Sequence, residues 1–171
     1  MAYITYDELP KLREQYKDKK IVFTSGTFDL THVGHVRYLE ACKELGDILV
    51  VAVGKDVDIK AHKGDERPIL KEPIRVKMID SFKPVDYTFL INSPLPGTHR
   101  HSPLQEVYDL LHPDIYVLNY DAKNLEHLEQ QCKAANITFV VLHLNREEPS
   151  DMQSISTTGL IEKIKNLAKN D

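Results

Sequence analysis

The chain has 171 residues, of which 42% are hydrophobic and 28% are charged, which predicts one globular domain with a core of its own. Its 22 Lys and Arg residues against 26 Asp and Glu residues give a formal net charge of −4. This acidic balance excludes the overall basic charge of a nucleic-acid coat protein, and we expect no nucleic-acid partner.

The cysteines, the N-terminus and the apolar runs exclude four further classes of protein. Cys42 and Cys132 lie far apart in helical patterns, which indicates neither a disulfide framework nor a thiolate zinc site. The N-terminus is polar and charged, unlike a secretory signal, and no apolar run approaches the ~18 residues of a membrane span. We therefore expect a cytoplasmic protein without a membrane partner.

Apolar segments alternate with helical patterns along the chain. Residues 1–20 are expected to form a helical lead-in with a short helix over 6–16. Five segments rich in β-branched residues then predict strands buried on both faces, at 21–24, 48–53, 87–91, 115–118 and 138–144. The spacing of apolar residues predicts helices near 33–45, 73–83, 104–111, 124–135 and 155–168. Gly46 is expected to end the first of these helices, and Pro73 and Pro84 to begin and end the second.

This alternation predicts an α/β fold, with a doubly wound, five-stranded parallel sheet and helices on both faces. No linker divides the chain, so we expect one domain over 1–171. Two stretches, 92–103 and 145–153, are longer than the usual loops of such a domain. Loops of this kind are either functional or tolerated insertions.

The segment 25–35, Ser-Gly-Thr-Phe-Asp-Leu-Thr-His-Val-Gly-His, carries the first functional motif. It follows a strand and precedes a helix, so it lies at the carboxyl edge of the sheet, where ligands bind. Gly26 allows a close turn, and Gly34 leaves room for a phosphate or base at the helix start. His32 and His35 can both donate hydrogen bonds to a phosphate in that position. A histidine pair with this spacing but without the turn is more often a surface feature.

Residues 26–40, GTFDLTHVGHVRYLE, resemble the His-x-Gly-His motif of the cytidylyltransferase-like nucleotidyltransferases. The resemblance implies a Rossmann-like fold that binds a nucleoside triphosphate and joins its α-phosphate to a phosphorylated acceptor, releasing pyrophosphate. It implies catalytic roles for His32 and His35 and nucleotide contacts from four residues of the turn and helix start, Gly26, Thr27, Phe28 and Gly34.

The stretch 55–69 resembles the Lys-Gly…Arg-Pro-Ile region of the heptose-phosphate adenylyltransferases. The resemblance implies that Lys60, Lys63 and Arg67 approach phosphates, with Lys63 catalytic and the other two binding substrate. The residues themselves predict a polar loop after the second strand, and a merely solvated charged loop is the alternative.

Further substrate contacts are implied by matches in the next part of the chain. Arg75, followed by Val85 and Asp86, resembles an Arg…Val-Asp stretch of the family, and Lys83 falls where some members carry a basic residue for the acceptor. Asp29 is expected to bind substrate as well. A surface salt bridge is the alternative for Arg75.

Leu118-Asn119-Tyr120-Asp121 stands where members have Gly-x-Asp or Gly-Gly-Asp. Asp121 is implied to contact the ribose or base, with a helix cap as the alternative. Asn119 and Tyr120 replace glycines, which narrows the space beside the nucleotide or changes the backbone path.

Residues 155–158, Ile-Ser-Thr-Thr, resemble a second motif of the family at the start of the last helix. Ser156, Thr157 and Thr158 would give side-chain and backbone donors to the β- and γ-phosphates. An ordinary hydroxyl cap is the alternative. Arg146 is a weaker phosphate-binding candidate in the acidic loop before this motif.

The expected partners are thus ATP or CTP, with ATP favoured, and a sugar or polyol phosphate. Mg²⁺ is expected through phosphate oxygens without direct protein ligands, and relatives imply a homodimer. An ADP-heptose-like product is favoured over a glycerol-3-phosphate cytidylyltransferase-type reaction. A non-catalytic nucleotide-binding protein is the other alternative. A fragment of an aminoacyl-tRNA synthetase is disfavoured by the length, the acidic charge and the missing Lys-Met-Ser-Lys-Ser loop.

Overall fold

The computed structural model describes residues 2–92, 103–144 and 156–169. The two long segments predicted above, at 92–103 and 145–153, therefore lie almost wholly outside the described residues, as does Arg146.

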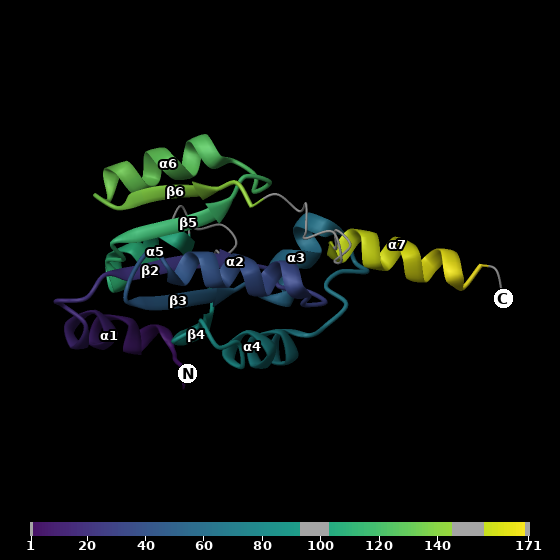
Figure 1. Ribbon diagram of the computed structural model, residues 1–171, viewed down its shortest axis with the longest axis horizontal. Helices are drawn as coiled ribbons and strands as arrows, with labels where there is room; N and C mark the ends of the chain where they lie inside the picture. Colours follow the sequence, from purple (N-terminus) through teal and green to yellow (C-terminus); the bar gives the residue numbers. More distant parts are fainter. Residues whose placement is uncertain (1, 93–102, 145–155, 170–171) are drawn as a thin grey trace.

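All the strands of the described residues run parallel in one sheet (Figure 1). Its order is β1-β4-β3-β2-β5-β6. The strands are β1 (Ala2–Tyr3), β2 (Ile21–Gly26), β3 (Ile48–Val53), β4 (Tyr87–Leu90), β5 (Ile115–Asn119) and β6 (Thr138–Leu142). The parallel α/β fold predicted from the sequence is confirmed.

The predicted number of five strands is wrong, because β1 adds a sixth at one edge of the sheet. Its two residues are too few to show a periodic pattern, so the sequence concealed it. Hydrogen bonds to β4 hold it in place, from Ala2 N–H to Asp86 O (3.1 Å) and from Ile4 N–H to Thr88 O (2.9 Å). Residues 1–20 are thus partly strand rather than wholly a helical lead-in.

The predicted helices are present with small shifts at their ends, and one helix was not predicted. They are η1 (Tyr6–Glu8), α1 (Leu9–Gln15), α2 (Val33–Lys43), α3 (Asp56–Lys63), α4 (Glu72–Asp80), α5 (Pro103–Leu111), α6 (Leu125–Ala134) and α7 (Thr157–Leu167). Helix α3 replaces the polar loop expected after the second strand. Ile59 is its only buried residue, so it has no apolar stripe that a sequence pattern could reveal.

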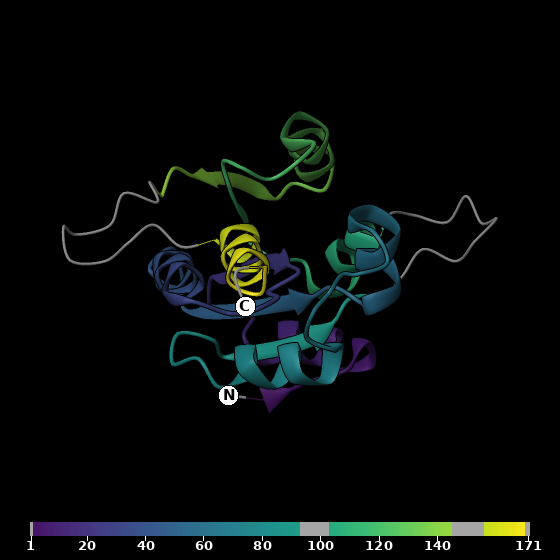
Figure 2. The same ribbon diagram turned by 90° about the vertical axis from the view of Figure 1, so that its right-hand side faces the viewer.

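Two hydrophobic cores lie on opposite faces of the sheet. Ile21 and Phe23 of β2 point to the face covered by α1, α5 and α6, whereas Val22 between them points to the face covered by α2 and α4. Figure 2 shows α1 and α2 on opposite sides of the strands. Helices on both faces, as the sequence predicts, leave only the edges of the sheet for ligands.

The chain reverses its direction of travel across the sheet between β2 and β5. Strands β3 and β4 follow β2 on one side, whereas β5 and β6 lie on the other. A crevice at the carboxyl ends of the strands is expected at such a switch point. Helix α7 projects outward from this edge (Figure 1). Among the described residues, no helix has the length and apolar character that crossing a membrane requires.

Candidate active site

A pocket of about 660 Å³ opens at the carboxyl ends of β2 and β5, at the switch point. The turn after β2, the start of α2, the β5–α6 connection and the start of α7 form most of its wall. The pocket is lined by thirteen of the sixteen residues predicted from the sequence, namely Gly26, Thr27, Phe28, Asp29, His32, Gly34, His35, Lys63, Arg67, Asp121, Ser156, Thr157 and Thr158.

The two histidines are fixed by the backbone at the start of α2. His32 Nδ1 accepts a hydrogen bond from Gly34 N–H, and His35 Nδ1 accepts one from His32 N–H, each at 3.2 Å. Their ring centroids lie 4.1 Å apart. An imidazole whose Nδ1 accepts carries the proton of its neutral form on Nε2. Both rings are therefore held in the tautomer that donates through Nε2, the form suited to a phosphate oxygen.

The turn after β2 has an unusual backbone that brings it against α2. Phe28 and Leu30 adopt left-handed φ angles of 51° and 43°, each costing on the order of 1–3 kcal/mol in a residue other than glycine. The buried Phe28 ring contacts the edge of His35, with centroids 5.6 Å apart. A Cβ on Gly26 would lie 3.0 Å from the Phe28 ring, so any larger residue here would require that ring to shift.

Asp29, predicted to bind substrate, is 2% exposed and engaged by the protein. Its carboxylate accepts from Ile69 N–H and Leu70 N–H, each at 2.9 Å, and from Arg67 Nε at 3.2 Å. Its carbonyl oxygen accepts from Thr157 Oγ1 at 2.8 Å. Asp29 thus ties the 67–70 connection and the start of α7 to the turn. The geometry supports a positioning role more than direct contact with a substrate.

Lys63 reaches the pocket from the last residue of α3. Its Nζ donates to Thr27 Oγ1 at 3.2 Å. Desolvation lowers the pKa of the Lys63 ammonium below its ordinary value, and the nearby charge of Arg67 lowers it further. Lys123 and Arg75 act in the same direction, while Asp29 opposes them. This concentration of positive charge in an acidic chain suits a polyanionic ligand.

At the β5–α6 connection, Asn119 and Tyr120 stand where the resembling family has glycines before the aspartate. Asn119, the last residue of β5, lines the pocket and donates from Nδ2 to Asp121 Oδ1 at 3.0 Å. The helix cap proposed as an alternative for Asp121 is wrong, because Asn124 is the N-cap of α6. The Asn119 side chain thus narrows the pocket beside Asp121.

At the start of α7, one hydroxyl residue caps the helix and the others face Asp29 or the pocket. Ser156 Oγ accepts from Gly159 N–H at 3.1 Å, an ordinary N-cap. Thr157 donates to Asp29, and the exposed Thr158 lines the pocket beside them. The first N–H groups of the helix and its dipole make this end of α7 suitable for phosphates.

Three predicted substrate residues lie outside the pocket. Lys60 is exposed on α3 but does not line the pocket. Lys83 precedes β4 and so lies at the amino edge of the parallel sheet, opposite the pocket. Arg75 is 0% exposed, so the alternative of a surface salt bridge is wrong. The structure does not place these three side chains in the pocket, because the sequence shows the charge of a side chain but not the edge of the sheet or the layer in which it lies.

The partners of Arg75 explain its burial. It donates to the carbonyl oxygens of Leu70 (2.9 Å), Thr27 (2.5 Å) and Gly54 (2.7 Å), and to Asp56 Oδ1 (2.8 Å). These acceptors lie after β2, after β3, at the start of α3 and before α4. Arg75 therefore joins the segments that build one wall of the pocket.

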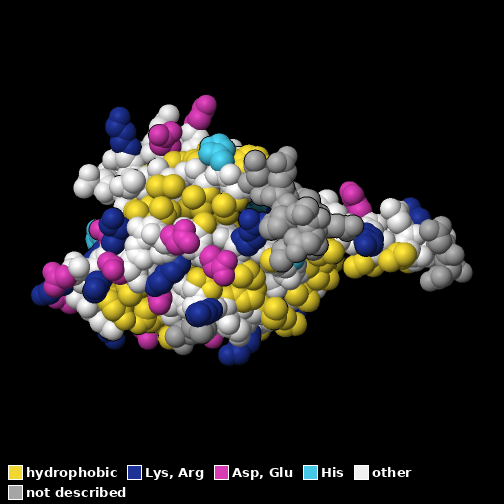
Figure 3. All heavy atoms as spheres, in the orientation of Figure 1, with side chains coloured by type: hydrophobic (Ala, Val, Ile, Leu, Met, Phe, Trp, Pro, Cys, Tyr) yellow, Lys and Arg dark blue, Asp and Glu magenta, His cyan; other side chains and the backbone are white. Residues whose placement is uncertain are grey.

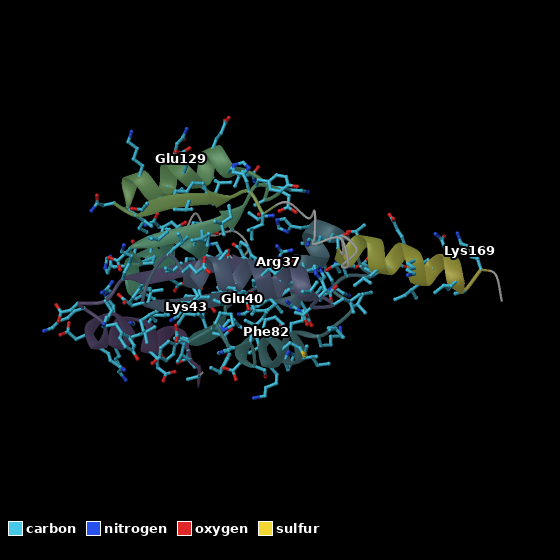
Figure 4. The ribbon with its side chains drawn as sticks, viewed as in Figure 1. Arg37, Glu40, Lys43, Phe82, Glu129 and Lys169 are labelled. Carbon is cyan, nitrogen blue, oxygen red and sulfur yellow. The ribbon has the colours of Figure 1, made fainter. Side chains whose placement is uncertain are left out.

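Three long polar side chains of the pocket, those of Arg37, Tyr38 and Lys123, are among the residues that the sequence prediction missed. Arg37 and Tyr38 lie on α2 and Lys123 precedes α6. The Tyr38 hydroxyl donates to Val117 O at 3.0 Å and pairs with Thr24 Oγ1 at 2.7 Å, which fastens α2 to β5 and β2. Among the labelled residues of α2, Arg37 lies nearest to α7 (Figure 4). Only their position in the first turns of the helix that begins after His32 could have indicated Arg37 and Tyr38, since Tyr38 lies three residues after His35.

Residues 23–163 match the family model described as cytidylyltransferase-like. Two curated relatives are named bifunctional protein HldE. The one from Campylobacter jejuni subsp. doylei is 37% identical over 159 residues, and the one from Helicobacter pylori is 37% identical over 157 residues. The matches cover 93% and 92% of this chain and 30% of each relative. The chain thus spans about 30% of the length of these relatives.

Solved structures agree with this match. A lipopolysaccharide core biosynthesis protein from Thermoplasma volcanium is 32% identical with a TM-score of 0.56, over 72% of this chain and 93% of that one. A pantoate-beta-alanine ligase from Francisella tularensis has a TM-score of 0.63 at 16% identity, over 100% of this chain and 80% of that one. The second likeness concerns the fold alone.

Proposed function

Since the chain belongs to the cytidylyltransferase-like family of nucleotidyltransferases, we propose that it transfers a nucleoside monophosphate from ATP or CTP to a sugar phosphate or polyol phosphate. An oxygen of the acceptor phosphate forms a bond to the α-phosphorus. The bond from that phosphorus to the α–β bridging oxygen breaks, and pyrophosphate leaves with its electron pair. The product is a nucleoside-diphosphate sugar or polyol.

The observation that carries this proposal is the pair of imidazoles at the start of α2, whose Nδ1 atoms both accept backbone hydrogen bonds. Their Nε2–H groups are the donors that stabilise the extra charge on the α-phosphate in the transition state. A phosphate monoester is already an anionic nucleophile, so it needs no general base. Catalysis then consists of positioning and electrostatic stabilisation, in which Lys63 takes part.

The triphosphate would lie between the turn after β2 and the start of α7. Thr27, Phe28 and Gly34 line the nucleotide site, and Ser156 to Thr158 hold the β- and γ-phosphates. The described residues contain no group of three or more His, Cys, Asp or Glu suited to a metal ion. We expect Mg²⁺ to bind phosphate oxygens and to supply charge neutralisation there, because this ion commonly keeps few protein ligands at such sites.

A sugar phosphate is the favoured acceptor and ATP the favoured donor, which gives an ADP-heptose-like product. The resemblance of 55–69 to heptose-phosphate adenylyltransferases and the similarity to a lipopolysaccharide core biosynthesis protein support this choice. A glycerol-3-phosphate cytidylyltransferase-type reaction is the alternative, because the turn after β2 and the start of α7 suit it equally. The reaction is proposed for the cytoplasm.

Pyrophosphate release tests the function. ATP, CTP, GTP and UTP are each combined with heptose, other sugar, glycerol and flavin phosphates in Mg²⁺. We expect release for one pair of substrates and loss of release with EDTA. If a triphosphate binds but no acceptor in the panel gives pyrophosphate, the result favours a non-catalytic nucleotide-binding protein and contradicts the proposed reaction.

A homodimer is proposed as the working form. Helix α7 exposes Ile164 (59%) and Leu167 (62%), and α4 exposes Ile74 and Met78. Figure 3 shows hydrophobic side chains along α7 and on the body beside it. Burial of such side chains against a second copy would remove them from water. We expect light scattering to give twice the chain mass, and Leu167→Lys to lower it. A wild-type monomer at tens of micromolar, a concentration range typical of such measurements, would contradict the dimer.

A further inference from the structure

Two lysines approach the pocket from opposite sides of β2. Lys63 ends α3, which follows β3, whereas Lys123 lies in the connection between β5 and α6. Strands β3 and β5 are the two neighbours of β2 in the sheet. Both side chains line the same pocket, and Lys63 Nζ donates to Thr27 Oγ1 in the turn after β2.

Among the described residues that act electrostatically on Lys63, positive charges outnumber negative ones. The groups that act on Lys63 are Arg67 from the connection before α4, Asp29 from the turn after β2, Arg75 from α4, and Lys123. Asp29 is the only carboxylate of this set, and it is already bound to Arg67 and two backbone N–H groups. Within residues 2–92, 103–144 and 156–169, neither lysine has a carboxylate within ion-pair distance.

Two ammonium groups share one pocket, and neither lies within ion-pair distance of a carboxylate of the described residues. Their mutual repulsion raises the free energy of the unliganded protein, and a bound polyanion relieves it. We propose that Lys123 binds the triphosphate together with Lys63, as a second phosphate-binding lysine supplied from the other side of the sheet. This inference rests on the proposed function only for the identity of the ligand, a nucleoside triphosphate. Lys123 touches phosphate oxygens and leaves the acceptor to other residues.

Lys123→Gln and Lys123→Arg test this role by direct binding of ATP, CTP and inorganic pyrophosphate. We expect Gln to weaken the binding of pyrophosphate, and of the triphosphate that the wild type accepts, by about 10- to 100-fold, the range for a hydrogen bond to a charged group. Arg should restore most of the affinity. Lys133→Gln is the matched control, an exposed lysine in the last turn of α6 and outside the pocket.

Steady-state kinetics give a second readout. With Lys123→Gln, the KM for the triphosphate should rise while that for the acceptor changes less than threefold. The positive charge of Lys123 lowers the pKa of Lys63, so its removal raises that pKa. Because Lys63 must be protonated to bind phosphate, the alkaline limb of kcat/KM should move to higher pH, and Lys133→Gln should leave it in place.

Several results would overturn the assignment. They are unchanged pyrophosphate and triphosphate affinity in Lys123→Gln, a loss confined to the acceptor KM, or an equal loss in Lys133→Gln. The binding measurements need no turnover. A wild type that binds pyrophosphate but shows no transfer would therefore refute the proposed reaction while leaving the role of Lys123 measurable.

Discussion

His35→Asn should fold and bind nucleotide but lose nucleotidyl transfer by roughly 10²- to 10³-fold in kcat, the usual effect of removing one transition-state donor. The side-chain oxygen of Asn can occupy the position of Nδ1 and keep the hydrogen bond from His32 N–H, which is 3.2 Å long in the structure. Asn has no donor at the position of Nε2. The substitution thus tests the proposed catalytic role of Nε2 while the hydrogen bond that Nδ1 accepts is preserved.

His35→Gln provides the opposite test. Gln can place an N–H near the position of Nε2 but gives no acceptor where Nδ1 lies. We expect this variant to keep more transfer activity than His35→Asn while unfolding at a lower temperature. Pyrophosphate release, nucleotide affinity and the thermal midpoint are measured for both. Full activity in His35→Asn would exclude a donor role for this imidazole.

Arg75→Met should destabilise the fold by about 3–5 kcal/mol, because it leaves the partly buried Asp56 carboxylate and three carbonyl oxygens without their donor. For a chain of this length that loss lowers the thermal midpoint by roughly 10 °C. Arg75→Lys should rescue little, since one ammonium group cannot reach acceptors that lie around a planar guanidinium.

The measurement is urea or thermal unfolding, with Lys77→Met as the control on the same helix. Lys77 is largely exposed and, within the described part of the chain, forms an ion pair with Asp80 alone, so its loss should change stability by less than about 1 kcal/mol. If Arg75→Met unfolds like the wild type and loses only acceptor affinity, the substrate role implied by the sequence is right and the structural role is wrong.

Hydrophobic patterning was a sound guide to the layers of the fold. The run 48–53 predicts β3 with its observed bounds, because a strand buried on both faces is apolar at every position. The same reasoning missed β1 and α3, which bury too few apolar side chains to leave a pattern. The periodicity of apolar residues indicates which side chains are buried. It therefore cannot predict an element that is held mainly by backbone hydrogen bonds or by one apolar contact.

The sequence by itself determined the parallel α/β fold and the position of the histidine pair at a strand-to-helix turn, since both depend on neighbours a few residues apart. Only the tertiary structure decided which distant charges meet there. It brought Lys123 and Arg37 into the pocket, buried Arg75 among backbone carbonyls, and left Lys83 at the opposite edge of the sheet. The reason is that strand order and direction determine which loops share an edge, and no local pattern contains that order.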